Sequence, residues 1–206
     1  MKGYYLITDS ALSNAGNVSD VKNAIAAGVE VIQFRNKTHS AKELYQEAGK
    51  LRILCKETTF IINDRIDIAL AVEADGVHIG QSDLPYSVVR KILGWKKIIG
   101  VTVHTLKQAI QYQKLGANYL GISPIFSTST KPDAGKACGD GLIREIKKHC
   151  TVPLIAIGGI NLNNARSVIE AGADGFCAIS AVVTKDDVTK EILKFQEMFD
   201  NFKIHK

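Results

Sequence analysis

The chain has 206 residues, of which 46% are hydrophobic and 23% charged, and this composition is typical of globular domains. No apolar run approaches the roughly 18 residues of a membrane span, and the first residues, Met1–Asp9, are too short and too soon acidic for a signal peptide. The net charge of +5 comes without a basic stripe or interleaved aromatic residues. We therefore expect neither a membrane nor a nucleic acid as partner.

The cysteines indicate the cellular compartment. Cys55, Cys138, Cys150 and Cys177 lie far apart, and none belongs to a Cys-x-x-Cys pair. This spacing argues against a zinc site and a disulfide scaffold, and it fits a reducing cytosol. We expect a cytoplasmic protein, and the sequence leaves open whether it is a homo-oligomer.

The chain alternates between strand-like and helix-like segments. The amphipathic segments of helical period are Ala41–Lys56, Leu106–Leu115, Gly141–Lys148 and Asn163–Ala171, with a last helix at about 186–199. The apolar, β-rich runs are Tyr4–Ile7, Val31–Arg35, Phe60–Asn63, Gly76–Ile79, Ile98–Val103, Tyr119–Ser123, Leu154–Ile157 and Phe176–Ile179.

Eight such units predict an α/β fold with a parallel sheet, either a (β/α)8 TIM barrel or an open doubly wound sheet. The repeats are even, and no Gly-x-Gly-x-x-Gly follows the first strand, which favours the barrel. No low-complexity linker divides the chain, so we expect one domain over residues 1–206.

In a barrel the chemistry lies at the carboxyl ends of the strands. The second strand ends in the segment Gln33-Phe34-Arg35-Asn36-Lys37. Solvated strand ends are the usual place for such cations. Gln33 and Arg35, however, lie in a strand expected to be buried on both faces, where an unpaired charge is costly. We therefore interpret the segment as part of a pocket in which Arg35 and Lys37 hold phosphates.

Two aspartates end neighbouring strands. Asp64 follows Asn63 after the third strand, and Asp83 lies just after the fourth. Each has an ordinary interpretation, Asp64 as a helix N-cap and Asp83 as a turn residue before Pro85. Together, beside cationic side chains on the next strand, they suit Mg²⁺, which takes one or two carboxylates and completes its shell with phosphates and water.

Hydroxyl groups and glycines follow the later strands. The loop after the sixth strand carries Thr128, Ser129, Thr130 and Lys131, a set of neutral donors with one point charge that suits phosphate oxygens. Thr102 ends the fifth strand and is a further donor. Nearby, His104 is either an acid–base group or an ordinary surface histidine.

A second phosphate site is predicted after the seventh and eighth strands. Gly158-Gly159 and Ile179-Ser180 end these strands, where barrel enzymes commonly hold a phosphate. A tight turn would also explain the two glycines.

These segments together resemble the thiamine phosphate synthase family, and the resemblance extends over nearly the whole chain. The motifs that carry it are Tyr5-Leu6-Ile7-Thr8-Asp9, Gln33-x-Arg35-x-Lys37, Asn63-Asp64-Arg65, Asp75-Gly76-Val77-His78-Ile79-Gly80-Gln81-x-Asp83-Leu84, Gly121-x-x-Pro124-Ile125-Phe126-x-Thr128-x-Thr130-Lys131, Ile157-Gly158-Gly159-Ile160 and Ile179-Ser180.

The resemblance implies a barrel enzyme that joins hydroxymethylpyrimidine diphosphate to the phosphate ester of hydroxyethylthiazole. It implies Mg²⁺ on Asp64 and Asp83, and it implies that Arg35, Lys37 and Lys131 stabilise the departing diphosphate. The pyrimidine diphosphate would lie against Gln33, Arg35, Lys37, Asn63, Thr102 and Lys131, and the thiazole phosphate against Thr128, Thr130, Gly159, Ile179 and Ser180. We add Phe34, Asn36 and Ser129 to the expected substrate-binding segments.

Two alternatives stay open. One is a thiazole tautomerase-like relative with a histidine acid–base, against which Asp64, Asp83 and Lys131 argue. The other is a non-catalytic protein that binds thiazole phosphate, for which two metal carboxylates would be superfluous. Thr102, Ser127 and Asn36 stand where the family usually has serine, proline and glutamate, which bears on substrate affinity more than on reaction type.

Overall fold

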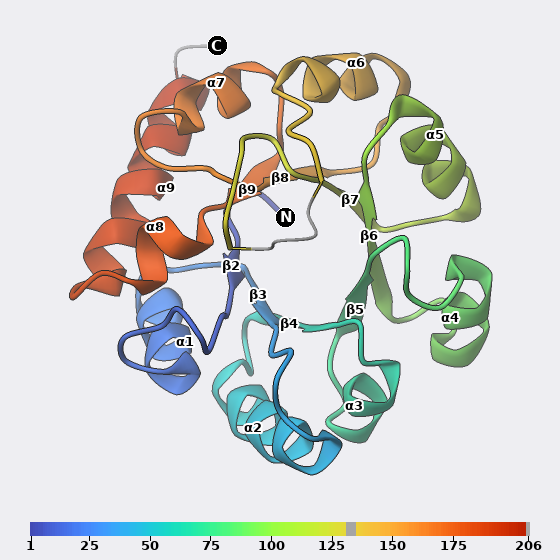
Figure 1. Cartoon of the computed structure of the whole chain (residues 1–206), viewed down its shortest axis with the longest axis vertical. Coiled ribbons are helices and arrows are strands. Elements are labelled where there is room, and N and C mark those ends of the chain that lie inside the picture. The colour runs from blue at the N-terminus through green and yellow to red at the C-terminus, as the bar shows by residue number, and fades with distance from the viewer. Residues whose placement is uncertain (131–134, 205–206) are drawn as a thin grey trace.

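The computed structural model of the chain describes residues 1–130 and 135–204, and it shows a ring of parallel strands inside a ring of helices (Figure 1). The strands form one sheet in the order β1-β9-β8-β7-β6-β5-β4-β3-β2. They are β1 Gly3–Tyr4, β2 Leu6–Ile7, β3 Val31–Phe34, β4 Thr59–Asn63, β5 Gly76–Ile79, β6 Ile98–Val103, β7 Tyr119–Ile122, β8 Leu154–Ile157 and β9 Gly175–Cys177.

The first predicted strand closes the barrel. It is divided at Tyr5 into β1 and β2, of which β1 pairs with β9 and β2 pairs with β3. The Tyr5 amide still donates to the carbonyl of Phe176 at 3.0 Å, so the two pieces bridge the first and last strands of the sheet. The expected (β/α)8 barrel is thus confirmed, and the open doubly wound sheet is not what the chain forms.

The helices lie on the outside of the barrel (Figure 1). Helix α2 begins with a capping box between Ser40 and Glu43, and the Thr105 side chain caps α5 by accepting from the Gln108 amide. The helices are α1 Asn17–Ala26, α2 Ala41–Leu54, α3 Ile66–Ala71, α4 Tyr86–Leu93, α5 Leu106–Leu115, α6 Gly141–His149, α7 Ala165–Glu170, α8 Ile179–Val183 and α9 Val188–Ile204. Within the described ranges, no helix is long and apolar enough to cross a bilayer.

The strands separate two apolar layers. Side chains that alternate along each strand pack either against the helices or into the barrel interior. In β3, Ile32 and Phe34 belong to the large core beneath the helices, whereas Val31 lies in the smaller interior cluster with Tyr5 and Tyr119. Gln33 therefore points inward from this strand, and Phe34 points away from the barrel interior.

The boundaries of some elements differ from the predicted ones for local reasons. The predicted strand Phe176–Ile179 ends at Cys177, because the chain turns at Ala178 and Ile179 already begins α8. The last helix begins at Val188 rather than near residue 186, because the Asp187 carboxylate accepts from the Lys190 amide and caps it there.

Candidate functional site

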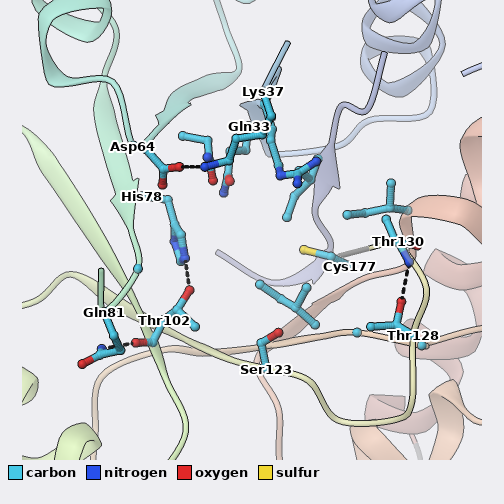
Figure 2. A pocket seen from close by; sticks show the side chains of 18 of the residues that line it. Gln33, Lys37, Asp64, His78, Gln81, Thr102, Ser123, Thr128, Thr130 and Cys177 are labelled. Atoms are coloured by element: carbon cyan, nitrogen blue, oxygen red, sulfur yellow. Dashed lines mark hydrogen bonds and ion pairs between the residues drawn. The ribbon is translucent and has the colours of Figure 1, made fainter. Parts of the chain in front are cut away.

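A pocket of about 310 Å³ lies at the carboxyl ends of the strands and contains side chains from most of them (Figure 2). Many residues that we expected from the sequence to form a site line this pocket. They are Gln33, Arg35, Lys37, Asn63, Asp64, Asp83, Thr102, Thr128, Thr130, Gly159, Ile179 and Ser180.

Arg35 enters the pocket just after β3 and is held from behind by Asp9. Its Nη1 donates to Asp9 Oδ2 at 2.7 Å. The Arg35 backbone amide donates to the Thr8 hydroxyl at 3.0 Å, and both Thr8 and Asp9 are buried. The ion pair with Asp9 therefore fixes one side of the Arg35 guanidinium, and the rest of the guanidinium faces the pocket.

Lys37, Asp64 and Asp83 form an acidic and basic cluster on the same side. Lys37 Nζ makes an ion pair with Asp64 Oδ2, and Asp83 Oδ2 accepts from the Gly80 amide at 2.7 Å. Burial raises the pKa of the Asp83 carboxyl, and the nearby Asp64 carboxylate raises it too. The Gly80 amide and Lys37 lower this pKa, but the net direction is upward. The two carboxylates are thus close enough to interact, as the sequence interpretation required.

The backbone shows why Asp64 faces the pocket. Asp64 adopts a left-handed conformation with φ of 59°, and its amide donates to the carbonyl of His78 at 2.8 Å. The residue at the N-cap of α3 is Arg65, so Asp64 does not have the helix-capping role that was its alternative. Few non-glycine residues adopt this conformation, and aspartate is among those enriched there.

The floor of the pocket is a row of hydrogen-bonded polar side chains. Gln33 Nε2 donates to Tyr5 Oη at 2.8 Å, and Tyr5 Oη lies 2.9 Å from Tyr119 Oη. Tyr119 Oη lies 2.8 Å from His78 Nδ1, and His78 Nε2 lies 2.8 Å from Thr102 Oγ1. Figure 2 shows the His78 ring standing between the Asp64 side and Thr102.

The opposite side of the pocket is formed by the segments after β7, β8 and β9. The Thr130 amide donates to Thr128 Oγ1 at 3.2 Å, and Figure 2 shows this pair across the cavity from Asp64. Gly159 has φ of 65°, and a Cβ there would lie 2.5 Å from the Ser127 carbonyl oxygen. Glycine is therefore required for the loop after β7 to lie against the end of β8.

Three predicted substrate-binding residues of the described part of the chain, Phe34, Asn36 and Ser129, are not in the pocket lining. The prediction for Phe34 is not supported by its position, because strand alternation directs its ring into the helix-facing core. Asn36 uses its side-chain oxygen to accept from the amides of Thr38 and His39, and Ser129 is exposed on the loop. Lys131 lies outside the described residues.

The structure also adds pocket residues that the sequence analysis did not select. His78 and Gln81 line the pocket, and the buried thiol of Cys177 reaches it from the interior layer. A signal for His78 was present, because it is a polar residue within a strand expected to be buried, the argument already applied to Gln33. His104, exposed at the pocket edge, has its Nδ1 2.6 Å from the Ser123 carbonyl oxygen.

A parallel barrel whose polar pocket lies at the carboxyl ends of its strands has the architecture of a barrel enzyme. Comparison with known proteins identifies the enzyme family. The family model described as thiamine monophosphate synthase matches residues 4–182. The thiamine-phosphate synthase of Methanosarcina mazei is 51% identical over 201 residues, which are 97% of this chain and 84% of that protein.

Two further relatives agree with this. The thiamine-phosphate synthase of Methanosarcina barkeri is 50% identical over 95% of this chain and 89% of its own length. A solved structure of thiamine phosphate pyrophosphorylase from Pyrococcus furiosus is 38% identical, with a TM-score of 0.89 over 97% of this chain and 96% of that one. The chain belongs to the thiamine monophosphate synthase family, and it is accordingly an enzyme of the transferase class.

Proposed function

We propose that the protein is a thiamine-phosphate synthase that joins hydroxymethylpyrimidine diphosphate to the phosphate ester of hydroxyethylthiazole. Family membership supports this reaction. The observation that carries it is the position of Asp64 and Asp83 together in a pocket that also contains Arg35 and Lys37. Carboxylates for a cation and basic groups for phosphates are what a diphosphate leaving group requires.

The donor set fits Mg²⁺. Within the described part of the chain, no group of three or more histidine, cysteine, aspartate or glutamate side chains is placed to hold a metal. A site with two carboxylates is nevertheless what Mg²⁺ uses when substrate phosphates and waters supply its other ligands. We therefore assign the ion to Asp64 and Asp83, where it would neutralise charge on the diphosphate as that group leaves.

The chain's own residues divide the pocket into two halves. On one side, Gln33, Asn63 and Thr102 would bind the pyrimidine diphosphate by neutral hydrogen bonds. Arg35 and Lys37, together with Lys131, would bind its phosphate oxygens as cations. Across the cavity, the thiazole phosphate would lie against Thr128, Thr130, Gly159, Ile179 and Ser180. The last three of these follow the final two strands of the barrel, which is the usual phosphate site of this fold.

The reaction is a dissociative substitution at the pyrimidine methylene carbon. The carbon–oxygen bond to the diphosphate breaks, and the diphosphate keeps the electron pair. The ring stabilises the methylene cation by resonance, and the thiazole nitrogen then donates its lone pair to form the new carbon–nitrogen bond. No protein nucleophile is needed, so catalysis comes from positioning and from charge stabilisation by Arg35 and Lys37.

An end-point assay with both substrates, with and without Mg²⁺, tests this function. We expect thiamine phosphate and diphosphate in equal amounts, and only with Mg²⁺. Asp64→Asn and Asp83→Asn should each abolish turnover and weaken the binding of Mn²⁺, used as a paramagnetic probe. Binding of thiazole phosphate without any coupling would instead indicate the non-catalytic alternative. Isomerisation of a thiazole without diphosphate release would indicate the tautomerase.

We also place the protein in the cytoplasm as a single-domain enzyme. The cysteines Cys55, Cys138, Cys150 and Cys177 are all free thiols, in keeping with a reducing compartment. Strands from Gly3 to Cys177 form one sheet, and α9 packs back against β1. Small phosphorylated molecules are its proposed partners.

A further inference from the structure

We infer that Tyr5, Tyr119 and His78 form a one-way hydrogen-bond relay that turns the Thr102 hydroxyl proton toward the substrate. Thr102 and Gln33 lie on different strands, β6 and β3, and the relay joins them across the barrel interior. Tyr5 and Tyr119 are positioning residues, because their hydroxyls lie beneath the pocket and act through His78. This inference rests on the proposed function, in which Thr102 donates to the diphosphate.

The direction of the relay follows from counting protons. Gln33 Nε2 donates to Tyr5 Oη, so Tyr5 has its own proton left to give. Burial raises the pKa of both Tyr5 and Tyr119 above the ordinary value, so each phenol keeps its one proton. Tyr5 then donates to Tyr119 at 2.9 Å, and Tyr119 donates onward to His78 Nδ1 at 2.8 Å.

The histidine passes this direction to Thr102. Because Nδ1 of His78 accepts, its single proton in the neutral ring lies on Nε2. The Nε2–H group donates to Thr102 Oγ1 at 2.8 Å. The Thr102 hydroxyl thus accepts from His78, and its own proton is left to donate into the pocket that Thr102 lines. A hydroxyl held in this way suits an anionic group and not a second donor.

The reverse direction satisfies the groups less well. If Thr102 donated to His78, the ring would carry its proton on Nδ1 and donate to Tyr119, and Tyr119 would donate to Tyr5. The Tyr5 hydroxyl would then accept from both Tyr119 and Gln33. Its own proton could no longer be donated to Tyr119. A buried donor that loses its partner is destabilising.

The fold provides a dedicated space for this relay. A Cβ at Gly100 of β6 would lie 2.5 Å from Tyr119 Oη and closer still to the ring. Glycine at this position therefore lets the Tyr119 ring lie across the neighbouring strand, with its hydroxyl between Tyr5 and His78. Tyr119 is fully buried, and its ring also contacts the rings of Tyr5 and His78, with centroids 5.9 and 5.3 Å away.

The first test is the tautomer of His78 in the free protein. Nitrogen-15 spectra of histidine-labelled protein distinguish the Nε2–H form, the Nδ1–H form and the doubly protonated ring, and the His78 signal is assigned by its loss in His78→Gln. We expect the Nε2–H form in the wild type and a mixture of forms in Tyr119→Phe. An Nδ1–H or doubly protonated ring in the wild type would overturn the relay, whether or not the protein makes thiamine phosphate.

The second test is kinetic. Tyr119→Phe should lower kcat/KM for the pyrimidine diphosphate about tenfold, the value of one hydrogen bond to a charged group, and leave the KM for thiazole phosphate unchanged. In a Thr102→Val background the same change should have no further effect, because the relay would have lost its target. Additive losses in the double variant would contradict the inference and indicate a general packing defect.

A matched control separates the relay from loss of stability. Tyr86 is also buried, and its hydroxyl accepts from Arg90 in the outer helix layer, away from the pocket. Tyr86→Phe should leave both the His78 tautomer and the kinetics unchanged. If Tyr86→Phe lowered kcat/KM as much as Tyr119→Phe does, the relay would have no specific role.

Discussion

The Asp9 carboxylate holds the Arg35 guanidinium by an ion pair of 2.7 Å, although the two residues lie at the ends of different strands. Asp9 is 6% exposed, and its second oxygen accepts from the Ala11 amide at 3.2 Å, so the carboxylate cannot turn away. One terminal nitrogen of Arg35 is occupied by this pair, and the remaining donors face the pocket. Asp9 thereby sets the direction in which the positive charge of Arg35 is presented.

Asp9→Asn should weaken use of the pyrimidine diphosphate. Asparagine keeps the contact to Ala11 but removes the charge that orients Arg35, so we expect kcat/KM for the pyrimidine diphosphate to fall about tenfold. The KM for thiazole phosphate should change little, because Arg35 lies on the other side of the pocket. Steady-state kinetics with each substrate varied in turn measures both values.

The surface pair Arg65–Asp67 provides the control for this variant. It is also an arginine–aspartate ion pair, at 2.5 Å, but neither residue lines the pocket. Asp67→Asn should therefore leave both kinetic constants near the wild-type values. Equal effects of the two variants would show that Asp9 acts through general electrostatics or stability, not through Arg35.

The fold was predictable because a barrel repeats one local pattern. Apolar, β-rich runs in alternation with helical segments indicated the barrel, and Leu106–Leu115 was predicted with the bounds that α5 has. The split of the first strand at Tyr5 was not predictable. It depends on pairing with β9 and β3, which come from distant parts of the chain.

The site was predictable where a residue type carried its own chemistry. Asp64, Asp83, Arg35 and Lys37 are charged residues at strand ends, and the barrel brings all of them to one pocket. Phe34 was included because the whole segment was taken, and its side chain lies in the helix-facing core because alternation along β3 turns every second side chain outward.

Residues that act through a partner were the ones missed. Asp9 becomes meaningful only because Arg35, 26 positions later, lies beside it in space. The His78 ring is held by hydrogen bonds to Tyr119 and Thr102, which lie on other strands. No local pattern encodes such contacts, so they required the three-dimensional structure.

Arg90 should be a strong determinant of stability rather than of activity. It is 7% exposed, and its guanidinium donates to the carbonyls of Gly94, Lys97 and Gly116 and to the Asn118 side chain, all within 3.3 Å. Removing these donors leaves several part-buried carbonyl acceptors without this partner. Arg90→Met should therefore lower the free energy of unfolding by about 3 kcal/mol or more.

Thermal unfolding measures this effect, and a chain of this size should lose roughly 6 °C or more in Tm. Lys91→Met on the same helix is the control, because Lys91 is exposed and its replacement should change Tm little. The kcat of Arg90→Met, measured well below its Tm, should be close to that of the wild type. A Tm equal to that of Lys91→Met would show that the hydrogen bonds of Arg90 contribute no net stability.

Asp20 should destabilise the protein at neutral pH. It is completely buried on α1, and neither carboxylate oxygen has a hydrogen-bond partner among the described residues. Burial raises the pKa of the carboxyl, and the nearby Ser13 lowers it only in part. Asp20→Asn removes the charge at nearly constant volume, and we expect it to increase the free energy of unfolding at pH 7 by about 1 kcal/mol.

The sign of the pH dependence follows from proton linkage. Because the pKa of Asp20 is higher in the folded state, the folded protein binds more protons at this group than the unfolded chain, so acidification stabilises the wild type here. The advantage of Asp20→Asn should therefore be largest at neutral pH and shrink as the pH falls toward about 4, the ordinary range of aspartate. Urea unfolding of both proteins at several pH values measures this difference.

Asp186→Asn is the control, because it removes the same charge at an exposed position. It should change the free energy of unfolding by less than about 0.5 kcal/mol at pH 7. A gain in stability equal to that of Asp20→Asn would assign the effect to net charge, not to burial.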